Sequence, residues 1–220
     1  MVTTRRIVLF LVATLAIVAG GIGSRRALTP DLALAADPTD KQCAFRNDMR
    51  KLWEGHITWT RVFIVSAAAG LPDKDAATQR LLQNQVDIGN AIKQFYGDAA
   101  GDKLTGLLKE HITTAAELVT AAKAGETAKM EDAKKRWFDN ADAIAAFLRG
   151  VNPKNWPAGE MNQMMHAHLD LTTAEVVARL HSDWAGDVKV YDNVHQQILK
   201  MADMLSMASS TSSLEKLNKL

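Results

Sequence analysis

Four polar residues interrupt helical stripes that are otherwise apolar, and they are the residues of this sequence best suited to chemistry: His56, Gln85, His111 and Asp187. Each lies three or four residues from apolar neighbours, so it falls on the face that a helix would bury. Imidazole and carboxylate groups from facing helices hold zinc, iron or copper in helical bundles. The sequence therefore predicts an interior polar site, with His56, His111 and Asp187 as candidate metal ligands.

The same residues would also form a hydrogen-bonded network inside a core. A buried imidazole can donate to a carboxylate such as Asp187, and Gln85 can bridge two helices. Ferritin-like di-iron bundles require Glu-x-x-His pairs, and this sequence has none. The residue pattern thus favours a structural network over a metal centre, and it identifies no catalytic residue.

Methionine and histidine residues suggest two other metal sites. Thioether and imidazole groups suit cuprous copper, and an alternative copper site would be made of Met164, Met165, His166 and His168. Methionine is also an ordinary filler of irregular cores. Met49 and His195, near opposite ends of the first and last helices, are a further candidate pair for haem ligation.

These residues stand on segments with helical periodicity. In residues 172–205, apolar side chains recur at steps of three and four, with no proline and a single glycine, Gly186. The capping box Thr172-x-x-Glu175 predicts that the final helix restarts at Thr172. No strand pattern and no repeat of 20–50 residues is visible.

Short connections between helices favour antiparallel neighbours, so we expect an all-α, up-and-down helical bundle. The simplest count has four arms. The second arm is kinked, and the last has a short helix before the long final helix. The arms are residues 40–69, 74–124, 126–150 and 157–206. The bundle domain would span residues 36–207, followed by a disordered polar tail at 208–220.

Residues 1–35 resemble a signal peptide or a membrane anchor. Arg5 and Arg6 precede an apolar run at 7–23, and Ala33-Leu34-Ala35 would permit cleavage before Ala36. Arg25 and Arg26 flank the run on its far side, which leaves an uncleaved anchor open. We therefore expect export to the periplasm or the extracellular space.

Charge and cysteine content exclude several classes of function. The chain has a net charge of +1, and without residues 1–35 it has 22 basic and 24 acidic residues. No basic run remains, so we expect no nucleic-acid partner. The single cysteine, Cys43, excludes an internal disulfide, a CxxC pair and covalent haem attachment through CxxCH.

Four stretches resemble a family of small, mostly exported bacterial helical proteins. They are WEGHITWTRVFIV (53–65), LLQNQVDIGNAIKQFYG (81–97), LLKEHI (107–112) and HLDLTTAEVVARL (168–180). The resemblance covers most of residues 48–206 and implies no agreed activity or site residues. Some relatives carry glycosyltransferase or acetylglutamate kinase labels. This sequence lacks the glycine-rich phosphate loop and α/β pattern of nucleotide-binding proteins.

The sequence favours an exported, non-catalytic bundle that binds a small ligand, a metal or a partner protein. A metal-dependent enzyme with its site inside the bundle is the alternative, and a purely structural or self-associating module is a third. Zinc, iron or copper would be the cofactor if there is one. The protein would contact the membrane only through an uncleaved N-terminal segment. The sequence is also compatible with a homo-oligomer.

Overall fold

The computed structural model describes residues 40–217 and the side chains of residues 43–206. This part of the chain forms six α-helices and contains no strand, which confirms the predicted all-α bundle. The helices are α1 (Asp40–Ala69), α2 (Lys74–Tyr96), α3 (Asp98–Ala124), α4 (Thr127–Val151), α5 (Ala158–Leu180) and α6 (Trp184–Leu217). The predicted signal peptide or anchor at residues 1–35 lies outside the described residues.

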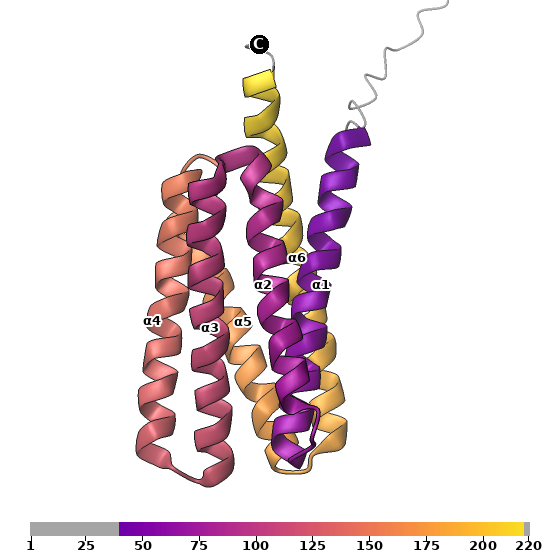
Figure 1. Ribbon diagram of the computed structural model, residues 1–220, viewed down its shortest axis with the longest axis vertical. Coiled ribbons are helices and arrows are strands. Elements are labelled where there is room, and N and C mark those ends of the chain that lie inside the picture. The colour runs from indigo at the N-terminus through magenta and orange to yellow at the C-terminus, as the bar shows by residue number, and fades with distance from the viewer. Residues whose placement is uncertain (1–39, 218–220) are drawn as a thin grey trace, which may run out of the picture. The chain divides into compact units, whose positions relative to one another are not determined.

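The helices form a closed ring. Each one packs against the next in the chain, and α6 packs against α1. Successive helices run in opposite directions, so α1 begins and α6 ends at the same end of the bundle, at the top of Figure 1. The connections α1–α2, α3–α4 and α5–α6 lie at the other end. The six-helix bundle is therefore built from three helical hairpins.

The predicted four-arm count is wrong first at residues 74–124. These residues form two antiparallel helices, α2 and α3, rather than one kinked arm. Gly97 allows the reversal because its φ of 85° lies in the region that favours glycine. The two helices then approach closely, since a Cβ at Gly101 would lie only 2.6 Å from the Gly89 carbonyl oxygen.

The last arm is also two helices, and the expected helix start at Thr172 is wrong. Thr172 lies inside α5, where its hydroxyl donates to the His168 carbonyl. The chain reverses at Ser182, whose φ is 60°. A carboxylate oxygen of Asp183 then accepts a hydrogen bond from the Gly186 amide and caps α6.

Moving the helix start changes which residues are buried. Trp184 and Val188 belong to the stripe expected to face the core, yet they are 55% and 57% exposed. The buried apolar face of α6 extends from Val194 to Leu205. Helix α6 itself reaches Leu217 and so passes the domain boundary expected at residue 207.

The three hairpins repeat one pattern of buried residues. Core positions of α1, α3 and α5 correspond at spacings of 55 and 57 residues: Met49, Leu104 and Met161; Trp53, Leu108 and Met165; His56, His111 and His168. Gly70, Gly125 and Ser182 fall at the same spacings, and all have positive φ. The returning helices α2, α4 and α6 correspond at spacings of 56 and 57 residues. This repeat is longer than the 20–50 residues considered in the sequence.

A small cavity marks where the three hairpins meet. Its volume is about 20 Å³, which is enough for about one water molecule. Equivalent residues from every hairpin line it, among them Met49, Leu104 and Met161. The main hydrophobic core therefore lies along a pseudo-threefold axis, and a smaller cluster around Phe63 and Val176 lies nearer the hairpin turns.

Candidate functional site

Each hairpin holds one buried histidine with an amide side chain from its second helix. In the second hairpin, His111 Nδ1 lies 2.9 Å from Asn140 Oδ1. The Asn140 amide nitrogen donates to the Leu107 carbonyl, one turn before His111. In the third hairpin, His168 Nδ1 lies 3.2 Å from Gln197 Oε1. The Gln197 amide nitrogen donates to the corresponding carbonyl, that of Met164.

In the first hairpin, two neighbouring residues share the role that one amide residue has in the others: Asn84 bonds to the backbone and Gln85 contacts the histidine. Asn84 donates to the Leu52 carbonyl, as Asn140 does to that of Leu107. Gln85 Nε2 instead contacts His56, with 3.3 Å between Nε2 and Nδ1. Gln85 Nε2 also donates to the Leu81 carbonyl at 2.8 Å and to Asn84 Oδ1 at 3.2 Å, so its contact with His56 is the longest of the three. His111 and His168 donate from Nδ1 to amide oxygens.

Burial keeps these three histidines uncharged. Each is 3% exposed. Burial lowers the pKa of His111 to about 3 and that of His168 to about 4. It also lowers the pKa of His56 well below its usual value, with His168 and His111 adding to the effect. The rings of His56 and His168 lie 5.5 Å apart between centres. The axis of the bundle therefore holds three neutral imidazoles.

The predicted polar site is only partly assembled. His56, Gln85 and His111 lie in the histidine layer, but Asp187 lies in a separate ion-pair cluster. Among the described residues, no three His, Cys, Asp or Glu side chains are arranged to hold a metal ion. The described structure therefore does not bring His56, His111 and Asp187 together, and arginine side chains donate to both oxygens of Asp187.

The alternative copper set is divided between the surface and the core. His166 Nε2 lies 2.7 Å from Asp142 on the outside of α4. Met164 and Met165 line the small axial cavity, and His168 pairs with Gln197. These methionines therefore fill the core, the role that we weighed against copper binding.

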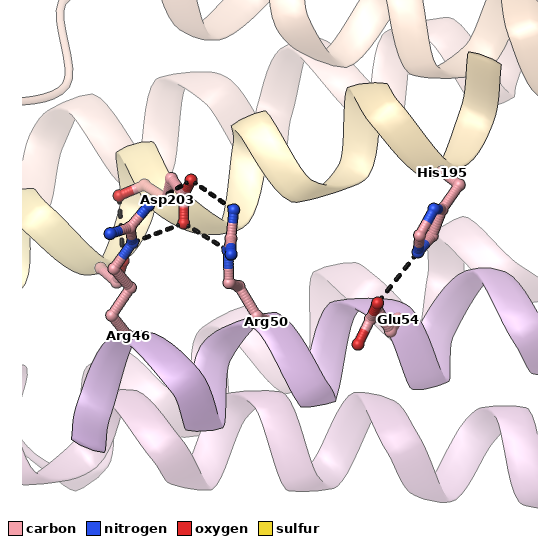
Figure 2. A network of polar contacts seen from close by, with 6 residues as sticks. Arg46, Arg50, Glu54, His195 and Asp203 are labelled. Carbon is pink, nitrogen blue, oxygen red and sulfur yellow. Dashed lines mark hydrogen bonds and ion pairs between the residues drawn. The ribbon is translucent and has the colours of Figure 1, made fainter. Parts of the chain in front are cut away.

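The haem pair also fails to assemble. His195 bonds to Glu54 on the surface, while Met49 is buried in the core. Figure 2 shows the His195 contact between α1 and α6, beside Asp203, which accepts hydrogen bonds from both Arg46 and Arg50. These paired charges make the upper part of the α1–α6 interface polar.

A buried cluster of charges lies further down the α1–α6 interface, and we call it the Arg61 cluster. Arg61 donates to Glu175 at 2.7 Å and to both oxygens of Asp187 at 2.9 and 3.0 Å. Arg179 donates to Asp187 at 3.1 Å. The Arg61 guanidinium also lies 4.5 Å from the centre of the Tyr191 ring. Two arginines thus balance two carboxylates that are each 1% exposed.

Glu175 is the titratable member of this cluster. Burial raises its pKa to about 7, while the hydrogen bond and charge of Arg61 act in the opposite direction. At neutral pH this carboxyl group is therefore balanced between its charged and neutral forms. No ligand-sized cavity among the described pockets includes Glu175, so the cluster shows no place for a substrate.

A larger cavity lies at the α4–α5 interface, and we call it the α4–α5 groove. Near the start of α5, Asn162 and His166 bond to Asp142 of α4. Toward the hairpin turns the α3–α4 hairpin and α5 diverge (Figure 1). The cavity there has a volume of about 250 Å³ and mostly apolar walls. Lys134 and the 46%-exposed Val177 lie at its rim.

The groove and the Arg61 cluster occupy equivalent positions in the repeat. Met130, Lys134 and Thr173 line the groove. At spacings of 57, 57 and 112 residues, their counterparts are Asp187, Tyr191 and Arg61. The guanidinium, carboxylate and ring that pack together at one interface are therefore replaced at the other by residues that leave a cavity.

Trp137 is a residue of the groove wall that the sequence did not single out. It is 3% exposed, lines the cavity and contacts His111, with 5.3 Å between ring centres. Its indole N–H has no hydrogen-bond partner. The sequence does not distinguish Trp137 from other buried tryptophans, because only the position of the cavity does.

His168, Asn140 and Gln197 were also missed as members of the polar layer. A signal for the repeat was present in the sequence. Leu52, His56 and Ile57 recur as Leu107, His111 and Ile112, with a threonine after each isoleucine. The third hairpin lacks the leucine and isoleucine of this pattern but keeps the histidine, His168.

The fold and its polar layer define a class of architecture, an all-α bundle of three helical hairpins around a histidine layer. No protein-family model, curated protein or solved structure matches the chain. Within the described residues, no helix is long and apolar enough to span a membrane.

Proposed function

We propose that this protein is an exported, non-catalytic binding protein that holds a small apolar molecule in the α4–α5 groove. The supporting observation is the cavity of about 250 Å³ at the α4–α5 interface, whose walls also include residues of α1, α2 and α3. A dry apolar cavity of about 150 Å³ binds benzene in another protein. The groove is therefore suited to a molecule somewhat larger than benzene, such as a bicyclic hydrocarbon.

The wall chemistry supports an apolar occupant. Phe63, Val119 and Val176 contribute hydrophobic side chains. Thr60, Thr172 and Thr173 also line the groove, and their hydroxyl groups already donate to carbonyls one turn earlier. The mouth has one acidic and one basic residue, Glu131 and Lys134. These opposite charges give no net preference for a charged ligand.

A binding function fits this site better than the alternative of a metal-dependent enzyme. Such an enzyme requires ligands that converge, and Asp187 is committed to Arg61 and Arg179. The groove itself is lined by few groups able to transfer a proton, since its charged residues lie at the exposed mouth. Export is supported by the arginine-led apolar run at residues 7–23.

Thermal unfolding with and without indane tests this proposal. A ligand that binds only the folded state raises the melting temperature, by an amount that increases with its concentration relative to its dissociation constant. We expect indane to raise the melting temperature of the wild type. The variant Ala122→Leu places extra carbon atoms in the groove, so it should lose this response.

Ala128→Leu is the matched control, because Ala128 is exposed on α4 and does not line the groove. It should respond to indane as the wild type does. No response in the wild type, or an equal response in Ala122→Leu, would overturn the proposal.

A further inference from the structure

The α4–α5 groove reaches inward as far as the pseudo-threefold axis of the bundle. Two sets of equivalent residues, with one residue from each hairpin, line it: Thr60, Ala115 and Thr172; Ile64, Val119 and Val176. Residues at equivalent places in all three hairpins surround the axis, as those around the small axial cavity do. The first set follows the three histidines of the polar layer by about one helical turn. The inner end of the groove therefore lies on the axis, next to the histidine layer.

The two ends of the groove differ in burial and in polarity. At the inner end, Ile64, Val119 and Val176 are only 2%, 4% and 7% exposed. The exposed residues of the wall all belong to α4 and α5, and they are Glu131, Lys134 and Val177. The groove therefore opens between α4 and α5, and its inner end is buried and apolar.

Among the residues that line the groove, none at the inner end can pair with a charged group of a ligand. The two charged residues of the wall, Glu131 and Lys134, lie at the mouth. The three threonine hydroxyl groups donate to backbone carbonyls one turn earlier, so they have no proton left for a ligand. A charged group at the inner end would lose its hydration without gaining a partner, which is strongly unfavourable.

The volume of the groove limits the size of its occupant. A dry cavity of about 150 Å³ binds benzene, which has six carbon atoms. By proportion, a groove of about 250 Å³ accommodates a hydrocarbon of about ten carbon atoms. A polar group on that hydrocarbon stays hydrated only if it lies at the mouth.

We infer that the ligand of the α4–α5 groove is an amphiphile with one polar end, such as a medium-chain fatty acid, whose hydrocarbon tail reaches the pseudo-threefold axis while its head stays at the mouth. The inference rests on the proposed function and adds the class of ligand and its orientation. The tail contacts Ile64, Val119 and Val176 at the inner end. The head remains in water beside Glu131 and Lys134, whose opposite charges leave the sign of its charge open.

The test compares decanoate with decanedioate, which has a chain of the same length and a carboxylate at each end. Both acids are ionised at about pH 8. Decanedioate must bury one of its two charges to enter the groove. Calorimetric titration of the wild type should therefore show it binding at least about a hundredfold more weakly than decanoate. Equal affinities would overturn the inference, and this comparison needs no variant.

A series of fatty acids tests how deep the tail reaches. In the wild type, affinity should rise about fourfold for each carbon added between hexanoate and decanoate, and then level off. The variant Ala115→Leu fills part of the inner end, so the rise should stop about two or three carbons earlier. Ala128→Leu, exposed and outside the groove, is the matched control and should behave as the wild type does. A rise that ends at the same chain length in Ala115→Leu as in the wild type would overturn the inference.

The same titrations separate this inference from the proposed function. If indane binds and no fatty acid does, the inference is wrong and the apolar site remains. If neither indane nor decanoate binds, the proposed function itself fails.

Discussion

The α1–α6 and α4–α5 interfaces join neighbouring hairpins in the same way but differ in what fills them. At the first, Arg61 lies between Asp187 and Tyr191. At the second, the equivalent residues leave a cavity of about 250 Å³. Because the helices around them correspond, the difference arises from side chains rather than from the fold. The comparison indicates that one interface closes the ring and the other is available to a ligand.

The third interface, between α2 and α3, shows another way of closing the ring. Gly89 and Gly101 allow the two backbones to come together, and Lys93 pairs with Asp102 at 2.6 Å. Close backbone contact thus closes one interface, and buried ion pairs close another. A second pocket, of about 480 Å³ over α3 and α4, is more open to solvent and has charged side chains such as Asp132 and Arg136 in its wall. The α4–α5 groove is more enclosed and more apolar than that pocket.

The largest expected effect comes from breaking the filled interface. Arg61→Met would leave Glu175 and Asp187 with Arg179 as the remaining cation. Removing one partner from a buried ion pair costs about 3–5 kcal/mol. Urea unfolding should show a loss of that size.

Arg136→Met is the control for this variant. Arg136 pairs with Glu117 and Asp132 on the surface, so its loss should change stability far less than the loss of Arg61. If the two variants were equally stable, the Arg61 cluster would have no special role in closing the ring.

The pH dependence of stability sharpens the comparison, because only the filled interface contains a buried acid. The folded-state pKa of Glu175, about 7, lies above its ordinary value of 4.5. Its stabilising contribution is therefore present below pH 4.5 and is lost as the pH rises through 7. We expect Glu175→Gln to remove this decline. Urea unfolding at a series of pH values from about 5 to about 9, spaced by about one pH unit, measures it. Glu160→Gln, at an exposed position on α5, should retain it.

The histidine layer should give the opposite slope in acid. The pKa values of His111 and His168 are about 3 and about 4 in the fold, below the ordinary 6.5. Their contribution is present above pH 6.5 and is lost as the pH falls toward those values. The test uses the Glu175→Gln variant, because Glu175 acts in the opposite direction over this pH range. Stability of that variant that stayed constant from pH 6.5 down to 4 would contradict the burial of neutral imidazoles.

A smaller effect is expected in the layer that all three hairpins share. His111→Leu leaves the Asn140 side-chain oxygen without its donor, at a cost of about 1–3 kcal/mol. A chelator should change neither variant nor wild type. His195→Leu, which removes a surface contact with Glu54, should cost at most about 1 kcal/mol. A His111→Leu variant as stable as the wild type would mean that the His111 side chain lies in solvent.

The sequence predicted the helical class and much of the polar layer because both depend on local periodicity. The stripes around His56 and His111 indicated burial correctly. The helix count was wrong at two places. Gly97 reverses the chain between α2 and α3, where a kink was expected. Ser182, a residue that usually avoids positive φ, marks the third hairpin turn, whereas Gly70 and Gly125 mark the other two. Thr172 and Glu175 matched a capping box but serve α5 packing and the Arg61 cluster instead.

The candidate site was harder to predict because it depends on contacts between distant helices. Arg61 and Asp187 are 126 residues apart, and no local pattern pairs them. A cavity is a property of packing, so nothing in the segment around Trp137 indicates it. Comparing the hairpins in register would have revealed the exchange of Arg61 for Thr173, although only after the repeat was recognised.

A crystal structure of the protein with indane tests the central claim most directly. We predict density for the ligand between α4 and α5, with its rings against Val176 and Met130. The Arg61 cluster, at the equivalent place in the repeat, should be unchanged. Ligand density at another interface with an empty α4–α5 groove would contradict the account.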